Sequence, residues 1–103
     1  MIKYKIDVTP TAEGDIWEAV HYINDQLSNP VAAQRMLDMI DKQYELLESM
    51  PRIGKEYIAG NGKIYRYVFV GNYMLFYTIE DTSVLVRRFL FAPSDVAVHL
   101  VRE

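Results

Sequence analysis

Cysteine is missing from the 103-residue chain, and histidine occurs only at His21 and His99. Without thiols a protein has neither a disulfide nor a thiolate-bound zinc ion, and two histidines so far apart in sequence form no metal-ligand motif. We therefore expect a fold that needs no metal and no cofactor. The lack of cysteine also fits a reducing cytoplasm.

Long apolar runs are missing as well. A secretory signal needs an apolar stretch of about 7 to 15 residues behind a basic start, but Lys3, Lys5 and Asp7 interrupt the first residues of this chain. The longest apolar strings, such as residues 73–77, are far shorter than the roughly 20 residues that span a bilayer. The sequence therefore predicts a soluble, cytoplasmic protein without a membrane segment.

Positive charge is scarce. The net charge is −3, and residues 1–50 hold four Lys or Arg against nine Asp or Glu, while residues 51–103 hold seven against five. Domains that grip a nucleic-acid backbone usually have a pI above about 9, because neutralised phosphates release counterions. The pI of this chain is 5.3, which argues against autonomous binding of RNA or DNA.

What remains is an ordinary globular composition, and we expect one domain over residues 1–103. Residues 2–8 alternate apolar and polar side chains, which predicts a strand with one buried face. Thr9 and Pro10 then form a capping signal, and Asn29 and Pro30 repeat it. Two consecutive helices are therefore predicted, the first ending near Leu27 and the second at Met50-Pro51.

The second half of the chain has the composition of strands. Residues 51–62 show no period and are predicted to be a loop, and strands are predicted over residues 63–70, 73–80 and 82–91. Gly71-Asn72 suits a tight hairpin turn. The predicted order is β-α-α-β-β-β, an α+β fold in which a helical hairpin packs on one face of a twisted, largely antiparallel sheet.

Three stretches of this second half resemble one known family: Tyr65-Arg66, the run Val70-Gly71-Asn72-Tyr73-Met74-Leu75-Phe76-Tyr77, and the segment from Val84 to Asp95. Many members of that family read Tyr-Arg, then Val-x-Asn-Tyr-x-x-Phe-Tyr, then Arg-x-x-Tyr-Gly-x-Arg-Asp. The first strand with the following Thr-Pro-x-Ala, and the turn between the helices, are also similar. Over nearly its whole length the chain resembles the RelE/ParE toxins of type II toxin–antitoxin systems.

The resemblance implies a toxin that acts on a macromolecular target and is neutralised by a cognate antitoxin, with which it assembles into a hetero-oligomer. RNA-cleaving members act on mRNA at the ribosome, and other members bind DNA gyrase. The last family motif is altered here: Arg88 and Asp95 are kept, but Phe91 replaces Tyr, Ala92 replaces Gly and Ser94 replaces Arg.

These departures bear on catalysis. Cleavage of RNA through the 2′-hydroxyl needs a general base, a general acid and cations for the developing charge. Met74 and Leu75 stand where RNA-cleaving relatives often carry an arginine. Each missing group typically costs about 10²- to 10⁴-fold in rate. We therefore favour a toxin that works by binding its target, as the gyrase-binding members do.

The candidate contacts with a target or antitoxin are Arg66, Arg87, Arg88 and Asp95. Arg66 and Arg88 match family positions, with a structural ion pair as the alternative role for each. Arg87 and Arg88 are consecutive on a predicted strand and are expected on opposite faces. The face expected for Arg88 is the one that carries Val84, Val86 and Leu90.

Weaker catalytic candidates are Lys55 and Tyr57, because functional residues favour loops, and His99, whose ordinary pKa lies near 6.5. Arg66 and Arg88 would complete such a set. An ordinary polar loop and a packing histidine are the alternatives, and Asp95 also suits a role in anchoring the last strand. The aromatic residues of the strands are expected to form core, with those on the uncovered sheet face available to a partner.

Three functions remain open. The first is a toxin that binds DNA gyrase or another target, and the second is a ribosome-dependent mRNA endonuclease that uses the weaker candidates. The third is a non-toxic binding module that keeps only the fold and the antitoxin partnership. A short neighbouring gene for a DNA-binding protein with a charged tail is expected, and its absence would weaken every interpretation that rests on the resemblance.

Overall fold

A computed structural model of the chain describes residues 2–92. In chain order it contains β1 (Lys5–Val8), α1 (Pro10–His21), the π-helical turn η1 (Tyr22–Gln26), α2 (Pro30–Ser49), β2 (Lys55–Ile58), β3 (Ile64–Val70), β4 (Tyr73–Glu80) and β5 (Ser83–Phe91). Neither α-helix of this described part is long and apolar enough to cross a membrane.

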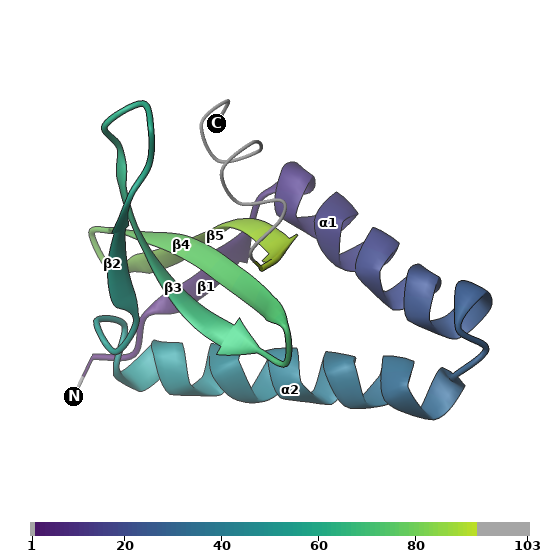
Figure 1. Cartoon of the computed structure of the whole chain (residues 1–103). Helices are drawn as coiled ribbons and strands as arrows, with labels where there is room; N and C mark the ends of the chain where they lie inside the picture. Colours follow the sequence, from purple (N-terminus) through teal and green to yellow (C-terminus); the bar gives the residue numbers. More distant parts are fainter. Residues whose placement is uncertain (1, 93–103) are drawn as a thin grey trace.

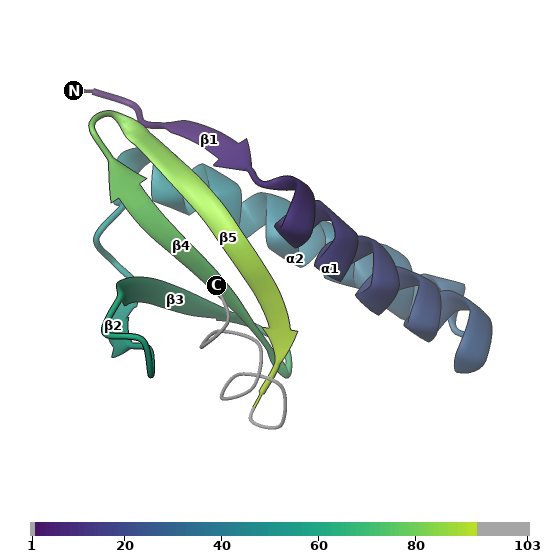
Figure 2. The ribbon, with the colours of Figure 1, turned by 90° about the horizontal axis from the view of Figure 1, so that it is seen from above.

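The strands form one mixed sheet in the order β1-β5-β4-β3-β2. Only β1 and β5 run parallel, because the helical hairpin lies between β1 and the rest of the sheet in the chain, and all other neighbours are antiparallel. The strands fan strongly across the sheet (Figure 2), as the right-handed twist of strands requires. The predicted α+β class and the helical hairpin are confirmed (Figure 1).

Both predicted helix starts are confirmed. Thr9 Oγ1 accepts a hydrogen bond from the Ala12 N–H at 3.1 Å, and Asn29 Oδ1 accepts one from the Ala32 N–H at 3.1 Å. The first helix differs at its end, because α1 stops at His21 and the chain continues to Gln26 as a π-helical turn. Such turns insert a residue into the helical register and frequently lie at functional sites.

The strand β2 is a correction to the predicted loop over residues 51–62. Its four residues mix charged and apolar side chains and are mostly exposed, so they lack the hydrophobic alternation that predicts a strand. What makes the segment a strand is its backbone pairing with β3, from Lys55 opposite Tyr67 to Ile58 opposite Ile64. Tertiary pairing of this kind overrides weak local preference.

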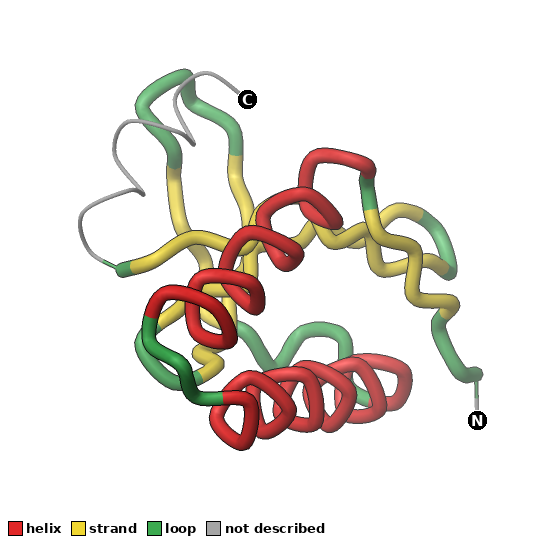
Figure 3. Tube along the Cα trace, turned by 90° about the vertical axis from the view of Figure 1, so that its right-hand side faces the viewer, coloured by secondary structure: helices red, strands yellow, loops and turns green. Residues whose placement is uncertain are grey.

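Hydrophobic clusters lie on both faces of the sheet. The helices cover one face, where the largest buried side chains are Leu47, Val70, Leu75, Tyr77, Val84, Val86 and Phe89. The other face carries a smaller cluster of Ala59, Tyr65, Met74, Phe76 and Leu90. The loop between β2 and β3 projects to the side of the molecule opposite α2 (Figure 3).

Candidate functional site

The two consecutive arginines of β5 lie at a β-bulge. Phe76 pairs with Arg88 and the next residue of β4, Tyr77, pairs with Val86, so Arg87 is the extra residue. A bulge shifts the alternation of side chains along its strand. Arg88 consequently lies opposite Phe76 and shares its face with Leu90, as predicted, but not with Val84 and Val86, which lie on the face that the helices cover.

Arg87 lies on that same second face, which corrects the expectation that the two arginines point in opposite directions. Its Nε donates to Thr78 Oγ1 at 3.1 Å, and its Nη2 lies 2.6 Å from Glu80 Oε2. Thr78 and Glu80 share a face of β4 with Phe76, because residues two apart on a strand point the same way. The guanidinium of Arg87 is thus paired along the neighbouring strand.

Arg88 is held by Asp15 of α1 in an almost buried ion pair. Its Nε lies 2.7 Å from Asp15 Oδ2 and its Nη2 lies 3.0 Å from Oδ1. The two side chains are only 12% and 13% exposed. Asp15 Oδ2 also accepts the Phe89 N–H at 3.0 Å. One carboxylate therefore joins the first helix to the last strand through three hydrogen bonds.

The position of Asp15 follows from the length of β1. Pairing between β1 and β5 ends at Val8 opposite Val86, which leaves the rest of that edge of β5 without a neighbouring strand. The Thr9 Oγ1 hydroxyl bonds to the Arg87 carbonyl at 3.3 Å, and Asp15 takes the Phe89 N–H. The start of α1 thus satisfies backbone groups that a longer strand would otherwise pair.

Arg66 supports a loop. Its Nη1 donates to the carbonyl oxygens of Gly54 at 2.9 Å and Arg52 at 3.3 Å, and its Nη2 lies 3.7 Å from Glu56 Oε2. The fully buried Tyr77 holds the same loop, donating its hydroxyl to the Pro51 carbonyl at 2.6 Å and accepting the Gly54 N–H at 3.0 Å. Burial raises the pKa of Tyr77, although the Gly54 N–H and Arg66 oppose that change. We call residues 51–54 the clamped loop.

Of the remaining weak candidates, Lys55 and Tyr57 lie on β2, on either side of Glu56, which pairs with Arg66 of β3. Lys55 is exposed on β2. The ring of Tyr57 packs edge-on against Phe76, with centroids 5.4 Å apart, and against Tyr67 at 6.4 Å. Tyr57 thereby belongs to an aromatic cluster on the second face. His99 and Asp95 lie outside the described residues.

His21 stacks on the exposed Trp17. Their ring centroids are 3.9 Å apart, and His21 Nδ1 lies 3.0 Å from the Trp17 carbonyl oxygen. Within residues 2–92, no three histidine, aspartate or glutamate side chains gather closely enough to hold a metal ion.

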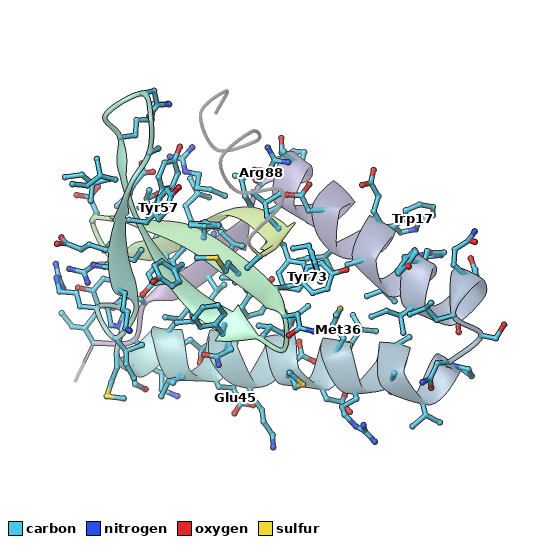
Figure 4. All side chains as sticks on the ribbon, viewed as in Figure 1. Trp17, Met36, Glu45, Tyr57, Tyr73 and Arg88 are labelled. Atoms are coloured by element: carbon cyan, nitrogen blue, oxygen red, sulfur yellow. The ribbon has the colours of Figure 1, made fainter. Side chains whose placement is uncertain are left out.

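A groove lies between the apex of the helical hairpin and the end of the sheet, and we call it the apex groove. Its polar part has a volume of about 370 Å³ and is lined by Asp15, Glu18, Ala19, Tyr22, Tyr73, Arg88, Phe89, Leu90 and Phe91. Its apolar part, of about 490 Å³, shares Tyr22, Tyr73 and Phe91 and adds residues that include Ile23, Leu27, Arg35, Met36 and Met39. Figure 4 shows Tyr73 between the sheet and the helices.

The sequence could have revealed Asp15. Ala12, Asp15 and Ala19 recur at helical spacing, so the carboxylate lies on the stripe that faces the sheet and needs a cation there. The sequence does not predict the apex groove, because the groove depends on the π-helical turn and on how the helical hairpin packs against the β3–β4 turn. Glu18 and Tyr22 read as ordinary surface residues of a helix.

Tyr44 lines an apolar groove between the two helices, together with Trp17 and Leu37. Burial, followed by the charges of Asp41 and Glu13, raises its pKa from 10.0 to about 12. The unfolded chain therefore loses this proton before the folded protein does, and stability is lost as the pH rises from 10 towards 12. Between about pH 9 and about pH 11, the free energy of unfolding measured with denaturant should fall less steeply for Tyr44→Phe than for the parent. The exposed Tyr22→Phe should behave as the parent does, and equal slopes for all three would contradict this expectation.

Both the sequence and the fold of the chain are similar to those of known proteins. Residues 6–91 match the family model described as "ParE toxin of type II toxin-antitoxin system, parDE". No curated protein matches the chain. A solved structure described as "Chromosomal ParDE TA system from P. aeruginosa" superposes with a TM-score of 0.67 at 15% identity, covering 86% of this chain and 96% of that one. At this identity the structural likeness concerns the fold.

Proposed function

Since the chain belongs to the ParE toxin family of type II toxin–antitoxin systems, we propose that it stops bacterial growth by binding a macromolecular target in the cytoplasm. DNA gyrase is the target proposed first, because gyrase-binding relatives need no RNA-cleaving groups. A cognate antitoxin neutralises the toxin by assembling with it into a hetero-oligomer.

The observation that carries this proposal is the ion pair between Arg88 and Asp15. Arg88 stands at the arginine position of the family's last motif, and both oxygens of the Asp15 carboxylate bond to its guanidinium. A guanidinium that already pairs with a carboxylate has fewer N–H donors and less net charge to offer a phosphoryl transition state. Arg88 is therefore better suited to holding α1 against β5 than to catalysing RNA cleavage.

Arg66 supports the same conclusion. Its guanidinium is directed at two backbone carbonyls of the clamped loop, and removing it would release that loop. Both arginines that match the family are thus engaged in holding the fold. A toxin built in this way acts through the shape and chemistry of its surface.

The surface offers a place for an antitoxin. Trp17, Tyr22, Leu27 and Val31 are each more than half exposed along the helical hairpin, and Tyr22 and Leu27 also line the apex groove. Exposed apolar surface of this kind marks an interaction site. Antitoxin segments that fold on docking cover such surfaces in this family.

The test is inducible expression of the chain with and without its adjacent gene. We expect growth arrest that the adjacent gene relieves, together with inhibition of supercoiling by purified gyrase and no new mRNA ends. Arrest accompanied by mRNA cut at codon-defined positions would instead establish the endonuclease. Normal growth despite ample folded protein would leave only a non-toxic binding module.

A further inference from the structure

The polar part of the apex groove combines acidic and aromatic side chains. Asp15 and Glu18 come from α1, Tyr22 from the following π-helical turn, Tyr73 from the start of β4 and Phe91 from the end of β5. Four elements, two from each half of the chain, thus supply one cavity of about 370 Å³. Its volume suits a single large side chain.

The charge of this cavity is negative. Asp15 is offset by Arg88, whose guanidinium lies 2.7 Å and 3.0 Å from the two carboxylate oxygens. Glu18 is exposed, and within residues 2–92 no hydrogen bond or ion pair engages its carboxylate. The cavity therefore holds one carboxylate that is not offset, and it favours a cation.

Aromatic rings form the walls. Tyr73 stacks on Phe89 with centroids 4.8 Å apart and an interplanar angle of 0°, and it meets Phe91 edge-on at 5.4 Å. Tyr22 and Phe91 remain 52% and 40% exposed. Aromatic faces attract cations through the ring quadrupole, and more strongly where water is excluded. Rings and carboxylate thus favour the same class of ligand.

The π-helical turn is a second, independent feature that indicates a functional site at the apex groove. It begins at Tyr22 and spans five residues, and its residues Tyr22 and Ile23 line the apolar part of the groove. Tyr22 lines both parts, so the altered register of the turn presents one ring to the two adjoining cavities. Turns of this type are uncommon and frequently accompany function.

We propose that the polar part of the apex groove binds an arginine side chain of a partner protein, with Glu18 as its counter-ion and Tyr22 and Phe91 as aromatic contacts. Guanidinium fits better than ammonium, because it is planar, stacks on rings and pairs with a carboxylate through two hydrogen bonds. Apolar side chains beside that arginine then enter the part lined by Met36 and Met39, whose thioethers adapt to varied shapes.

This inference rests on the proposed function for the identity of the partner, the antitoxin, whose docking segment would carry the arginine. The binding chemistry itself is testable without that partner. The probe is N-acetylarginine amide, titrated into the isotopically labelled full chain and followed by the backbone amide signals in NMR. The citrulline amide is the neutral control of the same shape, and the lysine amide tests the preference for guanidinium.

We expect the arginine amide to shift the signals of residues 18–22, 73 and 91, and the citrulline amide to bind about fivefold or more weakly, the effect of losing roughly 1 kcal/mol of charge pairing and cation–π attraction. Glu18→Gln should weaken arginine binding by a similar factor. Glu45→Gln is the matched control, because Glu45 is exposed on the side of α2 that faces away from Tyr73 (Figure 4). Tyr22→Ala tests the aromatic contact.

Equal binding of the arginine and citrulline amides, shifts confined to other residues, or equal effects of Glu18→Gln and Glu45→Gln would overturn the assignment. A lysine amide that binds as tightly as the arginine amide would overturn the choice of guanidinium. Because the titration needs no toxicity, arginine binding by a non-toxic chain would refute the proposed function alone. A toxic chain that does not bind arginine would refute this inference alone.

Discussion

Replacing Asp15 by alanine should lower the free energy of unfolding by about 3 to 5 kcal/mol, the usual cost of removing one partner from a buried ion pair. Asp15 and Arg88 are only 13% and 12% exposed, so solvent screens the pair little. The change leaves the Arg88 guanidinium without its carboxylate and the Phe89 N–H without its acceptor. Alanine returns at most about 0.7 kcal/mol through its better helix propensity, which is too little to compensate.

Denaturant unfolding followed by circular dichroism measures this loss. Asp38→Ala is the matched control, because Asp38 is an exposed helical aspartate, and it should change stability by no more than about 0.5 kcal/mol. Adding Arg88→Met to Asp15→Ala should recover part of the loss, since an apolar side chain removes the uncompensated charge. If Asp15→Ala alone is as stable as the Asp38→Ala control, the ion pair does not hold α1 to β5.

The elements that could be predicted from the sequence are those with local causes. Thr9-Pro10 and Asn29-Pro30 begin helices because a side-chain oxygen and a proline satisfy the first turn. The β3–β4 hairpin follows from Gly71, whose φ of 58° suits glycine.

The features that escaped prediction depend on contacts between distant residues. The strand β2 exists because β3 pairs with it, and the bulge at Arg87 appears only in the register of β4 against β5. That bulge changed the outcome for the candidate site, because it moved Arg88 off the face that carries Val84 and Val86. The family motif identified Arg88 as important, but only the tertiary structure supplies its partner.

Replacing Gly54 by alanine should cost about 2 to 4 kcal/mol and release the clamped loop. A Cβ atom at Gly54 would lie 2.5 Å from the Tyr77 hydroxyl and 2.8 Å from the Tyr67 carbonyl oxygen, closer than atoms pack. Tyr67 is fixed by sheet pairing and Tyr77 is fully buried, so the loop itself must withdraw. Withdrawal breaks the two hydrogen bonds of the Tyr77 hydroxyl, and each buried group left unpaired costs about 1 to 3 kcal/mol.

Gly14→Ala makes the comparison decisive, because the same substitution should act in the opposite direction there. Gly14 lies within α1, and a Cβ atom would meet nothing within 4 Å, so alanine should raise stability by about 0.5 to 1 kcal/mol. Tyr77→Phe removes the hydroxyl without adding an atom and should cost about 2 kcal/mol. If the clash at Gly54 acts by breaking these bonds, Gly54→Ala and Tyr77→Phe together should cost less than the sum of the two single changes. Full additivity in thermal or denaturant unfolding would mean that the loop and the tyrosine stabilise the fold independently.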